Sequence, residues 1–436
     1  MIESSDARST GSVLDEGLRA DGSRALLVLS ESARDPHLAP FVGAARLAHA
    51  LVVKVPGHAP RLGFLGPMER DEAARSGLPL LTPEALDVAR WSREGASPEV
   101  LWAEVIERAL HLCELAPGRI ALAGHLSAGV LSGVLARLAA AGWSFAPGEP
   151  LLALACKPKG AAQVDAVRAA IVGVEAAMRA VARRLVDAPV DGDGRLRDGD
   201  PSADPLRVGT LRRLADRVLA EHGLEQPAGN LIAPAEQGAV PHSVGDDARA
   251  LRAGETLIVD LFPRGQLFAD STRTFVVGTP PEVVRRAHGD VVAALERAES
   301  LARPGARGWE LQQAVCELLA ERGWPTPIHD PGTERGYVHG LGHGVGWEVH
   351  ELPSFREHAS DDQGALALGD VFTLEPGLYE PWVDAPAAEA AEGSEGLGWA
   401  VRVEDTYALV DDGGHPRLDR LTTLPRGLDP RALLLH

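Results

Sequence analysis

Four carboxylates and one histidine lie at the ends or inside otherwise apolar, strand-like runs in the second half of the sequence. In chain order they are Asp260 in TLIVD, Asp270 in ADSTRTF, His343 in HGLGHGVGWEVH, Glu375 in FTLEPGLY and Glu404 in VRVED. A buried carboxylate without a counter-charge is costly and tends to protonate. Two divalent cations would balance the four carboxylates, with the histidine as a neutral ligand. The set therefore predicts a site for two divalent metal ions.

Each of these residues alone has a plain structural explanation. An Asp at the end of a strand can form a turn or a cap, and a Glu before Pro-Gly can belong to a turn, so the prediction depends on all five together. Oxygen and imidazole ligands without a thiolate favour Mn²⁺, Co²⁺, Fe²⁺ or Zn²⁺ at an open site over a structural zinc site. Among these ions we expect Mn²⁺.

The histidine-rich segment has the spacing of a zinc-binding helix but not its composition. His339 and His343 are four residues apart, as on one face of a helix, yet glycine alternates through the segment at positions 340, 342, 344 and 346. Each glycine costs a helix about 1 kcal/mol. We therefore expect an extended, glycine-rich segment, which lets backbone and substrate approach closely and suits the wall of a pocket.

The elements expected to position these residues follow a repeated order from residue 157 onward. Apolar residues spaced three and four apart predict a helix from Val164 to Leu185 and a second one near 208–219. The pattern of two helices followed by strands then recurs, with helices expected at 282–301 and 309–322 and strands at 256–261, 267–277, 345–349, 371–375 and 399–410. This order predicts an α+β domain of two similar halves with a pocket at their seam.

Two segments rich in Gly, Pro, Asp, Ala or Glu interrupt this plan and are predicted to be loops, 187–205 and 381–398. The second lies between two candidate ligands. It is either a solvated surface excursion or part of the rim of the site.

The first part of the chain, residues 24–155, is predicted to be a smaller α/β domain. Apolar runs indicate strands at 24–30, 50–55, 119–124 and 151–156, and amphipathic patterns indicate helices at 98–114 and 127–142. No cluster of reactive side chains is evident in this region of the sequence. We expect it to cover the site or to build an oligomer.

Composition excludes several classes of function. The formal net charge is −19 and no basic stripe is present, so nucleic-acid binding is not expected. No apolar run reaches the ~20 residues of a membrane span, and the acidic start does not resemble a signal peptide. Cys113, Cys156 and Cys316 are odd in number and far apart, as expected of reduced thiols in a cytoplasmic protein.

The motifs together resemble the pita-bread metallopeptidases, the family of methionine aminopeptidase, Xaa-Pro aminopeptidase, prolidase and creatinase. The resemblance rests on ADSTRTF, HGLGHGVGWEVHELP, FTLEPGLY and VRVED, which occur in the family's order, and it covers roughly residues 157–425. It implies a pita-bread catalytic domain of α+β class at 157–436, preceded by a creatinase-like N-terminal α/β domain at 1–156. It also implies a homodimer.

The resemblance implies a role for each metal ligand. Asp260 would bind one metal ion, Asp270 and Glu404 would bridge both, and His343 and Glu375 would hold the second. A water between the two cations would lose a proton near neutral pH and become the nucleophile.

Other residues of the sequence resemble catalytic and substrate-binding positions of the family. Glu375 would act as general base and acid, while His242 and His350 would donate hydrogen bonds to the scissile carbonyl oxygen or the leaving nitrogen. His339 and Arg402 resemble substrate-binding positions of the proline-specific members. His339 could equally serve only to support its neighbours by hydrogen bonding.

One departure from the family pattern concerns the first two ligands. The interval from Asp260 to Asp270 is ten residues, one fewer than usual, and Phe262-Pro263 replaces a glycine-containing pair. Because a one-residue change in a strand reverses side-chain direction, the turn must absorb the difference. We expect an altered turn near Gly265.

The sequence thus predicts a metallopeptidase that acts at the N-terminus of short peptides, of the Xaa-Pro aminopeptidase or prolidase type. Trp347 or Phe355 could wall a proline ring, and both could instead be core residues. Two alternatives remain, a metal-dependent amidohydrolase of a small metabolite and a non-catalytic peptide-binding homologue.

Overall fold

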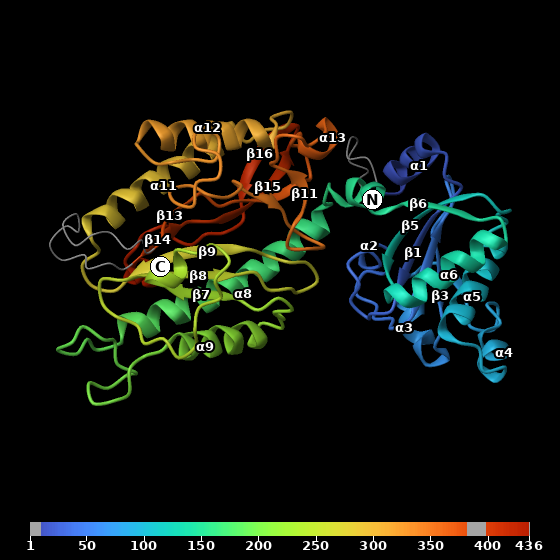
Figure 1. The fold of residues 1–436 in the computed structure, drawn as a ribbon, viewed down its shortest axis with the longest axis horizontal. Helices are drawn as coiled ribbons and strands as arrows, with labels where there is room; N and C mark the ends of the chain where they lie inside the picture. The colour runs from blue at the N-terminus through green and yellow to red at the C-terminus, as the bar shows by residue number, and fades with distance from the viewer. Residues whose placement is uncertain (1–9, 382–397, 436) are drawn as a thin grey trace. The chain divides into compact units, whose positions relative to one another are not determined.

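The computed structural model of the protein describes residues 10–381 and 398–435, which belong to two compact units, Met1–Pro158 and Lys159–His436 (Figure 1). The loop predicted at 381–398 therefore lies almost wholly outside the described residues. No helix in the described ranges is both long enough and apolar enough to cross a membrane.

The smaller unit is built on a six-stranded sheet in the order β4-β3-β2-β1-β5-β6. Its strands are β1 (Leu26–Ser30), β2 (Ala50–Lys54), β3 (Arg61–Phe64), β4 (Leu80–Leu81), β5 (Arg119–His125) and β6 (Ser144–Pro147). Its helices are α1 (Thr10–Asp21), α2 (Ala39–Val42), α3 (Arg70–Arg75), α4 (Val88–Arg93), α5 (Pro98–Leu112), α6 (Ala128–Ala140) and α7 (Glu149–Cys156), with a 3₁₀ turn at Pro67–Glu69.

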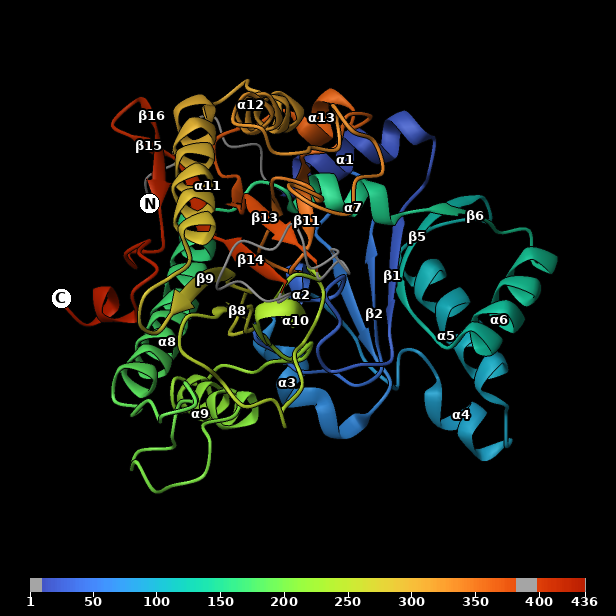
Figure 2. The same cartoon turned by 60° about the vertical axis from the view of Figure 1, so that its left-hand side comes forward.

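Both faces of this sheet are covered, which explains why β1 is apolar without alternation. Leu26 and Val28 pack with residues of α1 and α7, whereas Leu27 and Leu29 pack on the opposite face with residues of α5 and α6 (Figure 2). Three of the four predicted strands are confirmed, at β1, β2 and β5.

The fourth predicted strand, 151–156, is wrong, because these residues form the helix α7. A short apolar run does not distinguish a buried strand from a buried helix. The run LLALAC contains only leucine, alanine and cysteine, with no β-branched residue, and Pro150 at the start of the helix favours helix initiation.

The described part of the larger unit has four long helices and two short ones. They are α8 (Ala161–Val186), α9 (Val208–Glu221), α11 (Glu282–Leu301), α12 (Gly308–Glu321), α10 (Ala235–Gly238) and α13 (Asp361–Gly364), with a 3₁₀ helix at Pro430–Leu434. The four helices predicted from apolar spacing are confirmed, and no helix or strand forms within the predicted loop 187–205.

Three small sheets complete the larger unit, in the orders β7-β8-β9, β13-β14 and β11-β10-β12-β15-β16. Their strands are β7 (Leu231–Pro234), β8 (Thr256–Leu261), β9 (Ser271–Val276), β10 (His343–Gly344), β11 (Glu351–Ser354), β12 (Val371–Leu374), β13 (Gly377–Glu380), β14 (Trp399–Arg402), β15 (Asp405–Asp412) and β16 (His415–Arg420). Helices α8 and α9 pack against each other and lie beside β7–β9, whereas α11 and α12 lie beside the other strands (Figure 1). This is the predicted order of two helices and strands, repeated.

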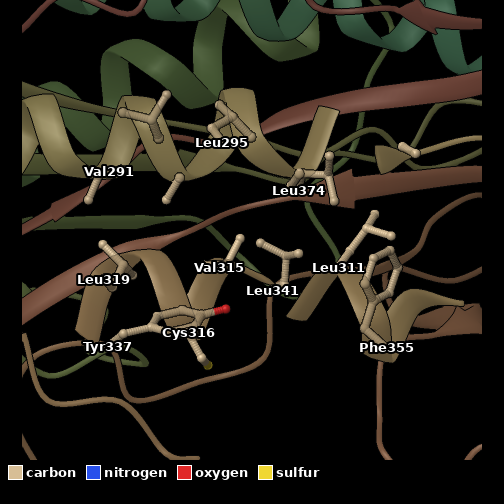
Figure 3. Close-up of a cluster of buried hydrophobic side chains, with 14 of the residues drawn as sticks. Val291, Leu295, Leu311, Val315, Cys316, Leu319, Tyr337, Leu341, Phe355 and Leu374 are labelled. Atoms are coloured by element: carbon tan, nitrogen blue, oxygen red, sulfur yellow. The ribbon is translucent and has the colours of Figure 1, made fainter. Parts of the chain in front are cut away.

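The core of the second half lies between α11, α12 and the strands (Figure 3). Leu311, Val315 and Leu319 are each four positions apart on α12, so they lie on one face of the helix, and all are buried. Phe355 belongs to this core, with its ring centroid 5.9 Å from that of Phe372. Of the two aromatics proposed as pocket walls, Phe355 is therefore a core residue.

Two predicted strands differ from the structure in ways that matter for the site. Residues 345–349 form no strand; the chain bends there and reverses, so that β10 pairs antiparallel with β11. The predicted strand 399–410 is interrupted at Val403-Glu404, where the chain passes from the β13–β14 sheet into the five-stranded sheet.

Candidate active site

The hairpin of β8 and β9 places the first two candidate ligands on one face. Asp260 pairs with Thr272 across the ladder, and Asp270 precedes Thr272 by two residues. Residues two apart on an extended chain point the same way. The short interval of ten residues is thus compatible with Asp260 and Asp270 facing the same space, and both are buried.

The two glutamates lie at matching interruptions of two paired strands. Leu374 pairs with Asp405 on one side of the interruption, and Gly377 pairs with Arg402 on the other. The same register places Glu375 opposite Glu404. Directly opposed residues in an antiparallel pair have Cβ atoms about 5 Å apart, and like charges there are destabilising. A cation between the two glutamates would remove this repulsion.

His343 on β10 lies against these carboxylates. Its Nε2 is 3.4 Å from Glu375 Oε1 and 3.7 Å from Asp270 Oδ2. One ligand atom each from Asp270, His343 and Glu404 lie within 4.8 Å of one another. The structure therefore gathers three predicted ligands, Asp270, Glu375 and Glu404, around His343.

Three buried carboxylate oxygens in this site accept no hydrogen bond from any described residue. They are Oδ1 of Asp260, Oδ1 of Asp270 and Oε1 of Glu404. A buried anionic oxygen without a partner costs several kcal/mol unless a cation binds it. The oxygen and imidazole donors fit divalent metal ions such as Mn²⁺ or Zn²⁺.

The crowding of carboxylates is reflected in their pKa values. Burial and the neighbouring charges of Glu404, Asp260 and Glu375 raise the pKa of Asp270 well above its usual range. Burial followed by the charges of Glu375 and Asp260 does the same to the pKa of Glu404. Burial raises the pKa of Glu375 to about 8. The raised pKa values reflect carboxylates that are buried close together.

His343 is neutral at neutral pH, the state in which an imidazole can bind a metal ion. Burial and the charge of His350 lower the pKa of His343 to about 4, so its ring carries a free lone pair at neutral pH.

Arg402 is the guanidinium that contacts the carboxylate cluster directly. Its Nη2 donates to Asp260 Oδ2 at 2.5 Å, its Nη1 to the Tyr379 hydroxyl at 2.9 Å and its Nε to Thr272 Oγ1 at 3.2 Å. Thr272 Oγ1 in turn donates to Glu404 Oε2 at 2.8 Å. Arg402 thus pairs directly with Asp260, whose charge also acts on Asp270 and Glu404.

His339 is held by hydrogen bonds on both ring nitrogens. Its Nδ1 lies 2.8 Å from the Gly340 carbonyl oxygen, so Nδ1 carries the proton and donates. Its Nε2, 2.9 Å from the Tyr379 hydroxyl, must then accept. Burial lowers the pKa of His339 to about 3, which keeps the ring neutral, and the two hydrogen bonds select this tautomer. The contacts agree with the supporting role considered for His339.

His350 reaches the site because the chain reverses between β10 and β11. Its ring centroid is 4.2 Å from that of His343, although seven positions separate them. Burial and then the charge of His242 lower the pKa of His350. His242 is exposed in the segment after α10, and its charge also lowers the pKa of His339. His242 is therefore close enough to both His339 and His350 for its charge to act on them.

The sequence analysis missed the groups that hold these residues in place. Tyr379 and Thr272 lie inside the recognised motifs FTLEPGLY and ADSTRTF, so a polar side chain within an apolar strand was the available signal. Arg273, also in ADSTRTF, is fully buried and bonds to the carbonyl oxygen of Glu404 at 2.7 Å and to Asp405 Oδ1 at 2.6 Å.

The sequence model of metallopeptidase family M24 matches residues 165–411. The "Xaa-Pro dipeptidase" of Pyrococcus furiosus is 34% identical over 216 residues, which are 48% of this chain and 52% of that protein. The "Xaa-Pro aminopeptidase 1" of Streptomyces coelicolor is 31% identical over 197 residues, which are 42% and 39% of the two chains. The chain thus matches about half the length of these curated relatives.

Solved structures with low sequence identity share the fold. The prolidase from Pyrococcus horikoshii OT3 aligns with a TM-score of 0.71 and 20% identity, covering 96% of this chain and 99% of that one. The X-Pro aminopeptidase from Thermotoga maritima aligns with a TM-score of 0.67 and 20% identity, covering 96% and 98%. The α+β pita-bread fold predicted from the sequence is confirmed.

Proposed function

This chain belongs to metallopeptidase family M24, and from that membership we propose that it is a metal-dependent peptidase. It removes the N-terminal residue from short peptides in which proline follows. The observation that carries the proposal is the set of three buried, unpartnered carboxylate oxygens, from Asp260, Asp270 and Glu404, beside the neutral ring of His343.

We propose two divalent metal ions, with Mn²⁺ as the expected metal, held by Asp260, Asp270, His343, Glu375 and Glu404. The opposed glutamates support this assignment, since a cation between them removes their repulsion. When bound, the ions supply Lewis-acid polarisation of the scissile carbonyl and activation of water.

The protein groups supply the proton transfers and the hydrogen bonds. Glu375 takes a proton from the attacking water and delivers it to the leaving nitrogen as the C–N bond breaks. His350 and His242 donate hydrogen bonds to the carbonyl oxygen as it gains charge, or to the leaving nitrogen. Arg402 donates to Asp260 and to the Tyr379 hydroxyl, and that hydroxyl donates to His339. These hydrogen bonds fix the positions of Asp260 and His339.

The preference for proline follows from the donors in the site. A proline nitrogen in a peptide bond carries no hydrogen, so a pocket for it needs donors aimed at the carbonyl and no acceptor waiting for an N–H. His350 and His242 are such donors. Buried Trp347, between His343 and His350 in sequence, is the aromatic side chain that remains to wall the ring.

The test combines metal content with a peptide panel. We expect metal-stripped protein to regain activity with Mn²⁺ and to cleave Ala-Pro and Ala-Pro-Ala with a higher kcat/KM than Ala-Ala-Ala or Met-Ala-Ser. Glu404→Gln should lose metal and activity together, whereas Glu357→Gln at an exposed position should lose neither.

Three results would contradict parts of the proposal. Full metal occupancy in Glu404→Gln would refute the ligand set. Equal or faster turnover of peptides without proline would refute the specificity. No turnover of any peptide would favour the alternative, a metal-dependent amidohydrolase of a small metabolite. The homodimer implied by the resemblance is part of the proposal and is tested by light scattering.

A further inference from the structure

A second group of metal-binding side chains lies in the smaller unit. One ligand atom each from Asp35, His37 and His125 lie within 4.8 Å of one another. No cluster of reactive side chains was predicted in residues 24–155, and the structure corrects that prediction. Ninety positions separate Asp35 from His125, so no local motif marks the group.

The sheet brings these residues together. Strands β1 and β5 are parallel neighbours, and their last residues, Ser30 and His125, are paired. Asp35 and His37 lie in the segment that follows β1. The carboxyl ends of neighbouring parallel strands meet at one edge of a sheet, which is where ligands bind in α/β sheets.

The two segments at this edge are fixed to each other by the backbone. The Glu31 N–H donates to the His125 carbonyl oxygen at 3.2 Å, and the Ser127 N–H donates to Glu31 Oε2 at 2.9 Å. Gly124 has a φ of +102°, and a Cβ there would lie 2.0 Å from the Leu29 carbonyl oxygen. Only glycine permits this approach of β5 to β1, so the position of His125 is built into the fold.

The spacing of the ligand atoms suits a single ion. Asp35 Oδ1 is 3.4 Å from His37 Nδ1, and Asp35 Oδ2 is 2.9 Å from His125 Nδ1. Ligands of a tetrahedral zinc ion, with bonds near 2 Å, lie about 3.3 Å from each other. The two imidazoles approach different oxygens of one carboxylate, and His125 Nδ1 is hydrogen-bonded to Oδ2. An ion that replaces this hydrogen bond would lie between the His125 ring and the carboxylate, with His37 within 4.8 Å.

The carboxylate of this group is buried, whereas one of its two imidazoles is open to solvent. The Asp35 side chain is 1% exposed, whereas the His125 side chain is 62% exposed. The Asp35 Oδ1 atom also accepts the His37 backbone N–H at 2.8 Å, which fixes the carboxylate. The anion is thus held in place by the fold, and an ion has an open path to it past His125.

We propose that Asp35, His37 and His125 form a binding site for one divalent transition-metal ion, of which Zn²⁺ is the probe. Two imidazoles and one carboxylate, without a thiolate, suit Zn²⁺ and its neighbours in the first transition series. Three protein ligands leave at least one coordination position for water or another small ligand. All three residues belong to the smaller unit, and the proposal does not rest on the proposed peptidase function.

The test is a Zn²⁺ titration of the metal-stripped full-length protein by calorimetry. We expect His125→Ala to bind one Zn²⁺ fewer than the wild type, and Asp35→Asn to do the same. His58→Ala, at an exposed histidine of the same unit, is the matched control and should bind as many ions as the wild type. The event lost in His125→Ala should persist in Asp270→Asn, which separates it from the peptidase centre.

Because His125 is exposed, its removal leaves the fold intact, which circular dichroism verifies. An unchanged number of Zn²⁺ ions in His125→Ala would overturn the proposal and leave the three residues as a hydrogen-bonded structural group. Anomalous scattering at the zinc edge from crystals of the wild type gives an independent answer. A peak between Asp35, His37 and His125 is expected, and its absence at saturating Zn²⁺ would also overturn the proposal.

Discussion

Replacing Arg273 with methionine tests whether the fold of the larger unit depends on one buried guanidinium. Arg273 is fully buried on β9 and uses all five of its N–H groups. Nη2 donates to Asp405 Oδ1, and the other acceptors are the carbonyl oxygens of Thr272, Glu404, Leu424 and Pro425, at distances of 2.6 to 2.9 Å. Arg273 thus joins β9, the ligand-bearing segment at Glu404 and the segment before the C-terminal 3₁₀ helix.

The cost of Arg273→Met follows from what it leaves behind. Asp405 keeps Arg426 Nε at 2.8 Å and Thr422 Oγ1 at 2.8 Å, so its charge is not isolated. The carbonyl oxygens of Thr272 and Glu404 keep a second donor, whereas those of Leu424 and Pro425 lose the donor from Arg273. A buried acceptor left unpaired costs about 1–3 kcal/mol, and the lost ion pair adds to this, so the total is on the order of 3–5 kcal/mol. At roughly 2–4 °C per kcal/mol for a domain of this size, the melting temperature should fall by about 6–20 °C.

Differential scanning calorimetry measures this shift. The matched control is Arg168→Met, which removes an exposed guanidinium whose Nη2 lies 2.8 Å from Asp419 Oδ2 in the same unit. An exposed pair contributes about 0–1 kcal/mol, so the control should melt within a few degrees of the wild type. Arg273→Lys retains the charge but has fewer donors, and should lie between the two. The reasoning fails if Arg273→Met and Arg168→Met melt at the same temperature.

Three further variants test the site and the pH dependence of stability. Asp270→Asn should lose metal, measured by elemental analysis, together with peptidase activity, and full occupancy would contradict the ligand assignment. His350→Ala should keep its metal but lose on the order of 10²–10³ in kcat, because a hydrogen bond to the developing oxyanion is removed; a normal kcat would make His350 structural. Burial lowers the pKa of His288, whose Nε2 lies 2.6 Å from the Arg426 carbonyl oxygen. Below about pH 6.5 His288 is protonated in the unfolded chain but stays neutral in the folded protein. The free energy of unfolding is therefore unaffected by this histidine above about pH 6.5 and decreases as the pH falls below it. Urea unfolding at about pH 7.5 and about pH 5.5 measures the free energy of unfolding that is lost on acidification. This loss should be smaller in His288→Gln than in the wild type or in the control His415→Gln, at an exposed histidine. An equal loss in all three would contradict the assignment.

The helices and the residue types of the candidate site were predictable because both depend on residues that are close together in the sequence. Apolar residues three and four apart define α8, α9, α11 and α12, since the period of a helix requires that spacing of any buried face. The ligand types were evident because charged residues inside apolar strands need an explanation wherever they occur.

Short apolar runs were less informative. The segment 151–156 was predicted to be a strand and is the helix α7, because periodicity over six apolar residues does not distinguish a buried strand from a buried helix. The lack of β-branched residues and the position of Pro150 were the signals that favoured the helix, which packs against α1.

Only the tertiary structure decided how the ligands meet. The interruptions that set Glu375 opposite Glu404 arise from pairing between β12, β13, β14 and β15, and the reversal after β10 that brings His350 to His343 arises from pairing with β11. The pairing of Arg402 with Asp260 spans more than a hundred positions.

The group of Asp35, His37 and His125 shows the same limit most clearly. Composition, periodicity and motif spacing are properties of neighbouring residues, so the sequence determined which chemistry is possible and which helices form. The distance between side chains far apart in the chain depends on strand order and register, which are fixed by the burial of whole sheet faces. Those distances, at the peptidase centre and at the edge of the N-terminal sheet, were determined by the fold alone.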